Sequence, residues 1–139
     1  MAYSTFNSAA ELHWLTATIL MTAAFWIPYV VNRMVEHGLW AALKNPDPEK
    51  APRAAWAARM AAAHTNAVEN LVLFAPLVVI SVLVQGSTPT TVIAATAYFI
   101  ARAAHFVIYA IGLPLLRTVA FAAGWAACIV IGFSILGVI

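Results

Sequence analysis

The chain is short of charge. Of its 139 residues only 5 are acidic and 7 are lysine or arginine, so charged residues make up 9% of the sequence. A soluble domain averages about 25% charged residues, and this chain falls far below that value. The net charge of +2 is small and is not gathered into a basic patch. We therefore expect no nucleic-acid partner, because such binding needs a concentrated positive surface.

Cysteine and glycine are scarce as well. The single cysteine, Cys128, cannot form an intrachain disulfide or a multi-cysteine metal site. No pair of histidine or cysteine residues has metal-ligand spacing with a suitable third partner, so we expect no metal site. The sequence contains no glycine-rich phosphate loop and no nucleophile elbow. These absences argue against zinc proteins, P-loop nucleotide hydrolases and α/β-hydrolases.

Apolar residues are what the chain has in abundance. They make up 64% of the sequence, and the mean hydropathy is +0.90. A helix needs about 20 apolar residues to cross a hydrocarbon core of about 30 Å. Four stretches satisfy this, at about 12–34, 54–84, 91–111 and 115–139. Backbone groups in lipid must bond internally, which favours helices. The sequence predicts an all-α membrane protein, with one four-helix transmembrane domain over residues 1–139.

The basic residues predict the orientation of these helices. Most fall in or beside the loop after the first helix, and one follows the third helix: Arg33, Lys44, Lys50, Arg53, Arg59 and Arg117. The turn between the second and third helices and both ends of the chain carry no lysine or arginine. By the positive-inside rule, the first and third loops are cytoplasmic and both termini are on the non-cytoplasmic side.

A few polar residues lie deep within the apolar stretches, where a charge costs about 2.5–3.5 kcal/mol on insertion scales. Helical periodicity predicts two polar faces. One is on the second helix and the other on the third: Arg59, Asn66, Glu69 and Asn70, and Tyr98, Arg102, His105 and Tyr109. At about 1.5 Å per residue, Glu69 and Arg102 both lie about 15 Å from the cytoplasmic face. We therefore expect an ion pair between Glu69 and Arg102 if the two helices adjoin. His64 falls off this face and is expected to be a packing residue.

Two interpretations of these polar faces are open. An interior cleft rich in arginine suits an anionic or zwitterionic ligand, because guanidinium groups bind carboxylates in bidentate fashion. Alternatively, the same side chains form a structural polar network that holds helices or subunits together. The excess of arginine over acid favours the ligand slightly.

Three segments resemble the MAPEG family, the membrane-associated proteins in eicosanoid and glutathione metabolism. The first runs from Arg59 to Phe74 and contains the pattern Asn66-x-x-Glu69. The second is Ala101-Arg102-Ala-Ala-His105-Phe-Val-Ile-Tyr109, and the third is Leu113-Pro114-Leu-Leu-Arg117. The resemblance covers nearly the whole chain and is strongest to bacterial members.

The resemblance implies a homotrimer in the bacterial inner membrane, with sites between subunits that open to the cytoplasm. It implies glutathione as cosubstrate, in contact with a set of residues carried over by position: Arg33, Arg59, Asn66, Glu69, Arg102, His105 and Tyr109. Arg117 would stabilise the glutathione thiolate. This makes sense because a fixed cation turns a thiol of pKa about 8.5 into a nucleophile near neutral pH.

The leading hypothesis is therefore a glutathione-binding membrane protein, acting as a transferase or peroxidase on lipophilic electrophiles that enter from membrane lipid. The alternative is a non-enzymatic MAPEG-type membrane protein. Its polar cleft would be a structural network, or would bind another anionic ligand or a lipid. Many relatives carry an arginine where this chain has Ala62, and that difference favours the alternative.

Overall fold

A computed structural model describes residues 9–45 and 52–139, and within them the chain is entirely helical. The helices are α2 (Ala10–Ala24), α3 (Ile27–His37), α4 (Leu39–Leu43), α5 (Ala55–Gln85), α6 (Pro89–Ile111) and α7 (Pro114–Ile135). Four segments are long and apolar enough to cross a membrane, and α2 with α3 forms the first of them. The predicted all-α, four-helix membrane fold is confirmed. Lys50, one of the basic residues used for orientation, lies outside the described residues.

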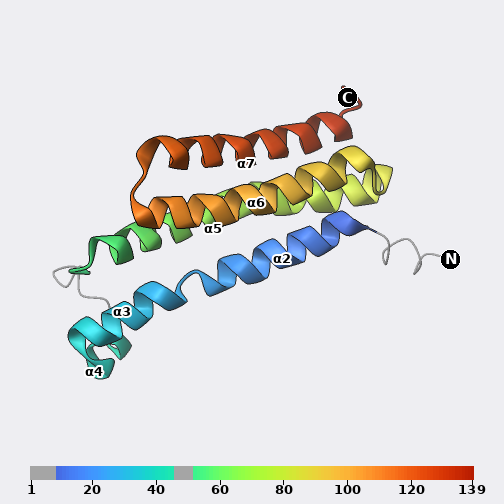
Figure 1. Cartoon of the computed structure of the whole chain (residues 1–139). Coiled ribbons are helices and arrows are strands. Elements are labelled where there is room, and N and C mark those ends of the chain that lie inside the picture. The colour runs from blue at the N-terminus through green and yellow to red at the C-terminus, as the bar shows by residue number, and fades with distance from the viewer. Residues whose placement is uncertain (1–8, 46–51) are drawn as a thin grey trace.

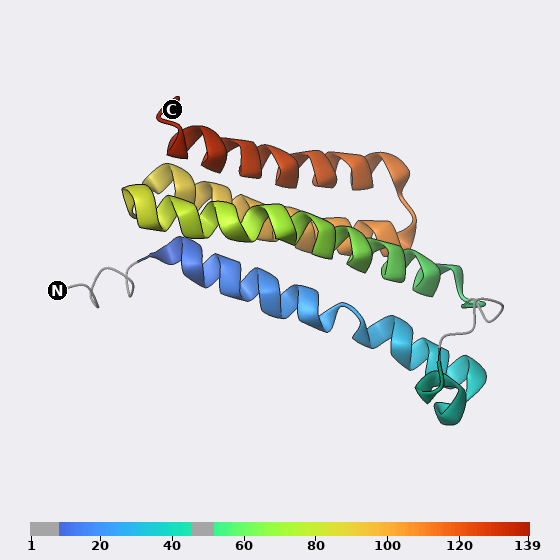
Figure 2. The same cartoon turned by 180° about the vertical axis from the view of Figure 1, so that it is seen from behind.

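The four membrane-length segments, called rods below, are α2 with α3, then α5, α6 and α7. Successive rods run in opposite directions across Figure 1. The start of α2, the α5–α6 turn and the end of α7 lie at one end of the molecule. The short helix α4, the start of α5 and the α6–α7 turn lie at the other end. In both views α2 and α7 lie on opposite sides of the α5–α6 pair (Figure 2). The helices α5 and α6 each pack against α2, against α7 and against one another, so together they form the centre of the bundle.

The helix boundaries differ from the prediction in three places. The first rod is broken between Ala24 and Ile27, because Pro28 has no N–H to continue the hydrogen bonding of α2. The helix α4 lies in a segment expected to be a loop. The last helix ends at Ile135 rather than at residue 139, since Gly137 adopts a positive φ of 68° there. The N–H groups beyond the end turn back to bond carbonyls of the last turn, as at many helix ends.

Two carboxylates of the first rod bind the starts of other helices. Glu11 of α2 is fully buried and accepts hydrogen bonds from Ser87 Oγ (2.7 Å), the Thr88 N–H (3.3 Å) and the Thr91 hydroxyl. At the opposite end, Glu36 of α3 accepts hydrogen bonds from two N–H groups at the start of α5. Helix N-termini have unpaired N–H groups and attract negative charge. The first rod is therefore attached to the bundle at both of its ends.

Aromatic stacking sets how the rods lie against each other. Phe74 of α5 stacks on Tyr98 of α6, with ring centroids 3.7 Å apart, at the centre of the larger apolar cluster. Phe25, in the break of the first rod, stacks on Phe106 of α6 at the same separation. These contacts fix the rotation of α6 against its neighbours, and with it the direction in which its polar residues point.

Candidate functional site

A polar cavity of about 270 Å³ lies close to the α6–α7 turn. Residues from three helices line it: Asn66 of α5, His105 and Tyr109 of α6, and Arg117, Thr118 and Phe121 of α7. Asn66, His105, Tyr109 and Arg117 were predicted as site residues from the sequence. The fold thus brings together residues that are up to 55 positions apart in the chain, from Asn66 to Phe121.

The positively charged side chain of Arg117 lies over the aromatic ring of Tyr109 in this cavity. The guanidinium carbon of Arg117 lies 4.3 Å from the centroid of the Tyr109 ring, which is a close cation–π contact. The ring of His105 meets Tyr109 edge-on, with centroids 5.5 Å apart, and also lies near Phe121. A fixed cation, a phenol and an imidazole therefore share one concave surface, which suits an anionic or strongly polar ligand.

Arg102 lies behind the cavity rather than in its lining. Its side chain is buried, and it donates hydrogen bonds to Asn66 Oδ1 (3.4 Å) and to the carbonyl oxygen of Phe121 (3.0 Å). Its guanidinium carbon lies 5.3 Å from the centroid of the Phe121 ring. Arg102 therefore contacts two of the residues that line the cavity.

The predicted ion pair between Glu69 and Arg102 does not form in the single chain. The helices α5 and α6 do adjoin, but Glu69 is exposed on the outer face of α5. Arg102 points between α5 and α7 and bonds to Asn66 and to carbonyls of α7 instead. The expectation was wrong because equal depth in the membrane does not place two side chains on facing sides of their helices.

Two other predicted site residues lie outside the cavity. Arg59 donates from Nε to the carbonyl oxygen of Ala110 (2.9 Å), at the end of α6, where a cation meets the negative end of the helix dipole. Arg33 is partly buried on α3, a helix that packs against α4 and α5. His64 shares a 2.9 Å hydrogen bond with the Tyr29 hydroxyl, as suits a packing residue.

Sequence reasoning did not select Thr118 and Phe121 as site residues. Thr118 follows Arg117 directly, and its hydroxyl donates to the carbonyl oxygen of Pro114 (3.0 Å). Phe121 lies one turn after Arg117 on α7 and so shares its face. The four-residue spacing from Arg117 was the available signal for Phe121. An apolar residue within an apolar helix has no other feature that marks it as a site residue.

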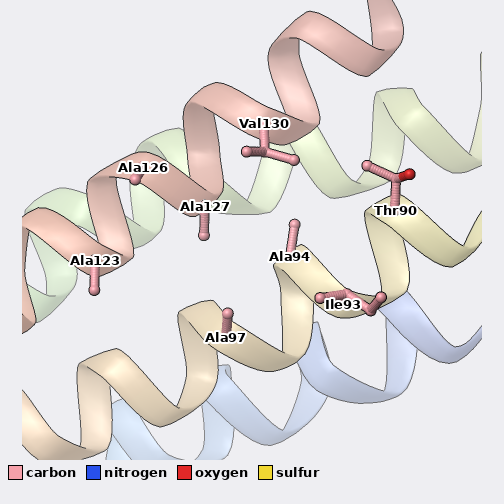
Figure 3. A pocket seen from close by; sticks show the side chains of 8 residues that line it. All are labelled: Thr90, Ile93, Ala94, Ala97, Ala123, Ala126, Ala127 and Val130. Atoms are coloured by element: carbon pink, nitrogen blue, oxygen red, sulfur yellow. The ribbon is translucent and has the colours of Figure 1, made fainter. Parts of the chain in front are cut away.

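A second cavity of about 390 Å³ lies between α6 and α7, toward the opposite end of the bundle. Figure 3 shows small side chains of the two helices facing one another across it: Thr90, Ile93, Ala94 and Ala97 of α6, and Ala123, Ala126, Ala127 and Val130 of α7. Thr90 supplies its only polar side chain. The residues that line this cavity include no acid, base or nucleophile.

Within residues 9–45 and 52–139, no group of three histidine, cysteine or acidic side chains is placed to hold a metal ion. The four membrane-length helices define an integral membrane protein with a polar cavity near one end of its bundle.

The MAPEG family model matches residues 12–137, and the chain belongs to this family of membrane proteins of eicosanoid and glutathione metabolism. No curated protein and no solved structure gives a significant match.

Proposed function

We propose that the protein binds glutathione in the polar cavity and that Arg117 stabilises its thiolate. The observation that supports this is the meeting of Asn66, His105, Tyr109 and Arg117 in one cavity of a MAPEG family member. Glutathione carries carboxylates, amides and a thiol. The cavity offers a guanidinium, a phenol and a side-chain amide, which are the groups that bind carboxylates and peptide carbonyls.

The proposed reaction is thiol transfer to a lipophilic electrophile. The thiol loses its proton to water, and the guanidinium of Arg117 favours the resulting thiolate. The sulfur then forms a bond to the electrophilic carbon, and the leaving group departs with the bonding electron pair. A peroxidase reaction would begin from the same thiolate. The apolar substrate enters from membrane lipid, the medium that surrounds these helices.

The remaining predicted residues fit an arrangement in which neighbouring subunits complete the site. Glu69 is exposed on the outer face of a membrane-spanning helix, where an unpaired charge is costly. A homotrimer would cover it and would bring Glu69, Arg33 and Arg59 of one subunit toward the cavity of the next. The basic residues near the cavity end support a site open to the cytoplasm of a bacterial inner membrane.

The proposal is tested by titrating the purified protein with glutathione while following thiolate absorbance in the ultraviolet at neutral pH. Wild type is expected to bind and to show thiolate formation. Arg117→Ala is expected to lower the thiolate fraction about tenfold or more, because the fixed cation is gone. Lys44→Ala, which removes an equal charge outside the cavity, is the control. No binding to wild type at millimolar glutathione would refute the proposal.

The second candidate is a non-enzymatic membrane protein whose polar residues form a structural network or bind another anionic ligand or lipid. Ala62 favours it, since many relatives have an arginine there. A structural network predicts that Glu69→Ala weakens the oligomer while Arg117→Ala changes little. Catalysis predicts that Arg117→Ala keeps the oligomer intact and lowers the thiolate fraction about tenfold or more. Native mass spectrometry of both variants, beside the glutathione titration, separates the two candidates.

A further inference from the structure

Among the residues that the structure describes, Arg102 is the largest whose side chain is fully buried, with 2% of its surface exposed. It carries a charge within a membrane-spanning bundle, where such a residue costs free energy unless it is well bonded. Its hydrogen-bond acceptors are Asn66 Oδ1 and the carbonyl oxygens of Ala120 and Phe121. Arg102 therefore connects α6 to both helices that complete the polar cavity.

The sequence leaves room for this side chain at Gly124. A Cβ atom at Gly124 would lie 2.5 Å from one terminal nitrogen of Arg102 and 2.9 Å from its guanidinium carbon. Those separations are well inside van der Waals contact, so the guanidinium would have to move. Gly132, two turns further along α7, has no neighbour closer than 4.0 Å to its own added Cβ. Gly124 is thus needed for the space it leaves beside Arg102.

We propose that Arg102 is a positioning residue, which sets the hydrogen-bonding direction of Asn66 and the place of α7 without touching the ligand. Asn66 carries one acceptor group and one donor group. Because its oxygen faces Arg102, its NH₂ group is left for the cavity. The ligand group at Asn66 is then an acceptor, a carboxylate or a peptide carbonyl, and an ammonium group is disfavoured there.

The same guanidinium of Arg102 donates a hydrogen bond to the Phe121 carbonyl oxygen of α7, about one turn after Arg117 and Thr118. Movement of Arg102 would therefore disturb two sides of the cavity together. The ligand part of this inference rests on the proposed glutathione site, whereas the effect on Asn66 does not.

Four variants test the inference. Arg102→Lys keeps the charge but loses the guanidinium fork, and Gly124→Ala keeps the arginine but displaces it. Gly132→Ala is the matched glycine control. Tyr98→Phe is the matched contact control, because it removes a buried hydroxyl beside Arg102 that has no hydrogen-bond partner among the described residues. For each variant the side-chain amide resonance of Asn66 is measured by nitrogen-15 NMR without ligand, and the glutathione dissociation constant by calorimetry.

We expect Arg102→Lys and Gly124→Ala to shift the Asn66 resonance. Glutathione binding should weaken about tenfold, because Asn66 no longer holds its NH₂ group toward the ligand and the hydrogen bond that it donates there is lost. The two controls are expected to do neither. If Arg102→Lys does not fold, Gly124→Ala carries the test alone. Weakened binding with an unmoved Asn66 resonance overturns the inference, because Arg102 would then touch the ligand itself. A shifted resonance in a protein that never binds glutathione supports the positioning role and refutes only the proposed function.

Discussion

The charged side chains of this protein differ in the hydrogen-bond partners that offset the cost of placing a charge in an apolar bundle. Glu11 is fully buried and is bonded by two hydroxyl groups and a backbone N–H. Arg102 is buried against an amide and two backbone carbonyls. Glu69 is exposed on a membrane-spanning helix of the single chain. Buried charges persist where they are bonded, and the homotrimer that we propose would supply such a partner for Glu69.

Removing the charge of Glu11 tests whether its hydrogen bonds stabilise the fold. Glu11→Gln keeps the shape of the side chain but weakens its bonds to the start of α6. We expect a loss of about 1.5–3 kcal/mol of unfolding free energy, the range for hydrogen bonds to charged groups. Thermal unfolding in detergent measures it. Thr16→Ala is the control, because the Thr16 hydroxyl is exposed and bonds only within its own helix. Equal stability of Glu11→Gln and wild type would contradict the expectation.

Among the helices, α5 has its first N–H groups capped by a residue that is distant in the sequence. No side chain of its own caps its N-terminus at Ala54. Glu36 of α3 supplies the acceptor instead, at 2.9 Å from each of the N–H groups of Arg53 and Ala54. Helix α6 has a local capping box of Thr88 and Thr91, to which Glu11 adds a carboxylate. The first rod thus contributes to the starts of both α5 and α6.

Glu36→Ala is therefore expected to free the first turn of α5. Amide hydrogen exchange at Arg53, Ala54 and the following turn should become several-fold faster, because these N–H groups lose their acceptor. Exchange measured by mass spectrometry on peptides from the start of α5 reports this. Glu69→Ala, an acid on the same helix but away from its start, should leave that exchange unchanged. Unaltered exchange in Glu36→Ala would show that the cap is not needed.

The whole molecule is polarised along its axis. The basic residues Arg33, Lys44, Arg53, Arg59 and Arg117 all belong to the end that carries α4 and the α6–α7 turn (Figure 1). The polar cavity lies near that end, whereas the apolar cavity of Figure 3 lies toward the other. One end of the bundle is thus suited to a charged ligand and the remainder to lipid.

This polarity predicts the orientation of the chain in the membrane. Alkaline phosphatase fused after Ile139 should be active, because the enzyme works only outside the cytoplasm, and a fluorescent protein fused there should stay dark. Fusions after Lys44, in the first loop, should show the reverse pattern. A fluorescent C-terminal fusion in intact bacterial cells would overturn both the orientation and the cytoplasmic site.

The four rods and most residues of the cavity could be predicted from the sequence alone. Apolar run length and helical period are local properties, so they identified the spans and put His105 and Tyr109 on one face of α6. The helical period also put Asn66 on the polar face of α5, and the family resemblance added Arg117. Local signals did not reveal α4, and the early end of α7 depends on the conformation of Gly137, which the apolar pattern masks.

The direction in which each polar face points depends on packing between helices and could not be predicted from the sequence. Helical period tells which side chains share a face, but the rotation of one helix against another is set by packing. Here the stack of Phe74 on Tyr98 and the space at Gly124 turn Arg102 toward α7. Glu69 is left on the outer surface of α5. The expected ion pair therefore does not form in the single chain, and Arg102 supports the cavity through Asn66 and Phe121.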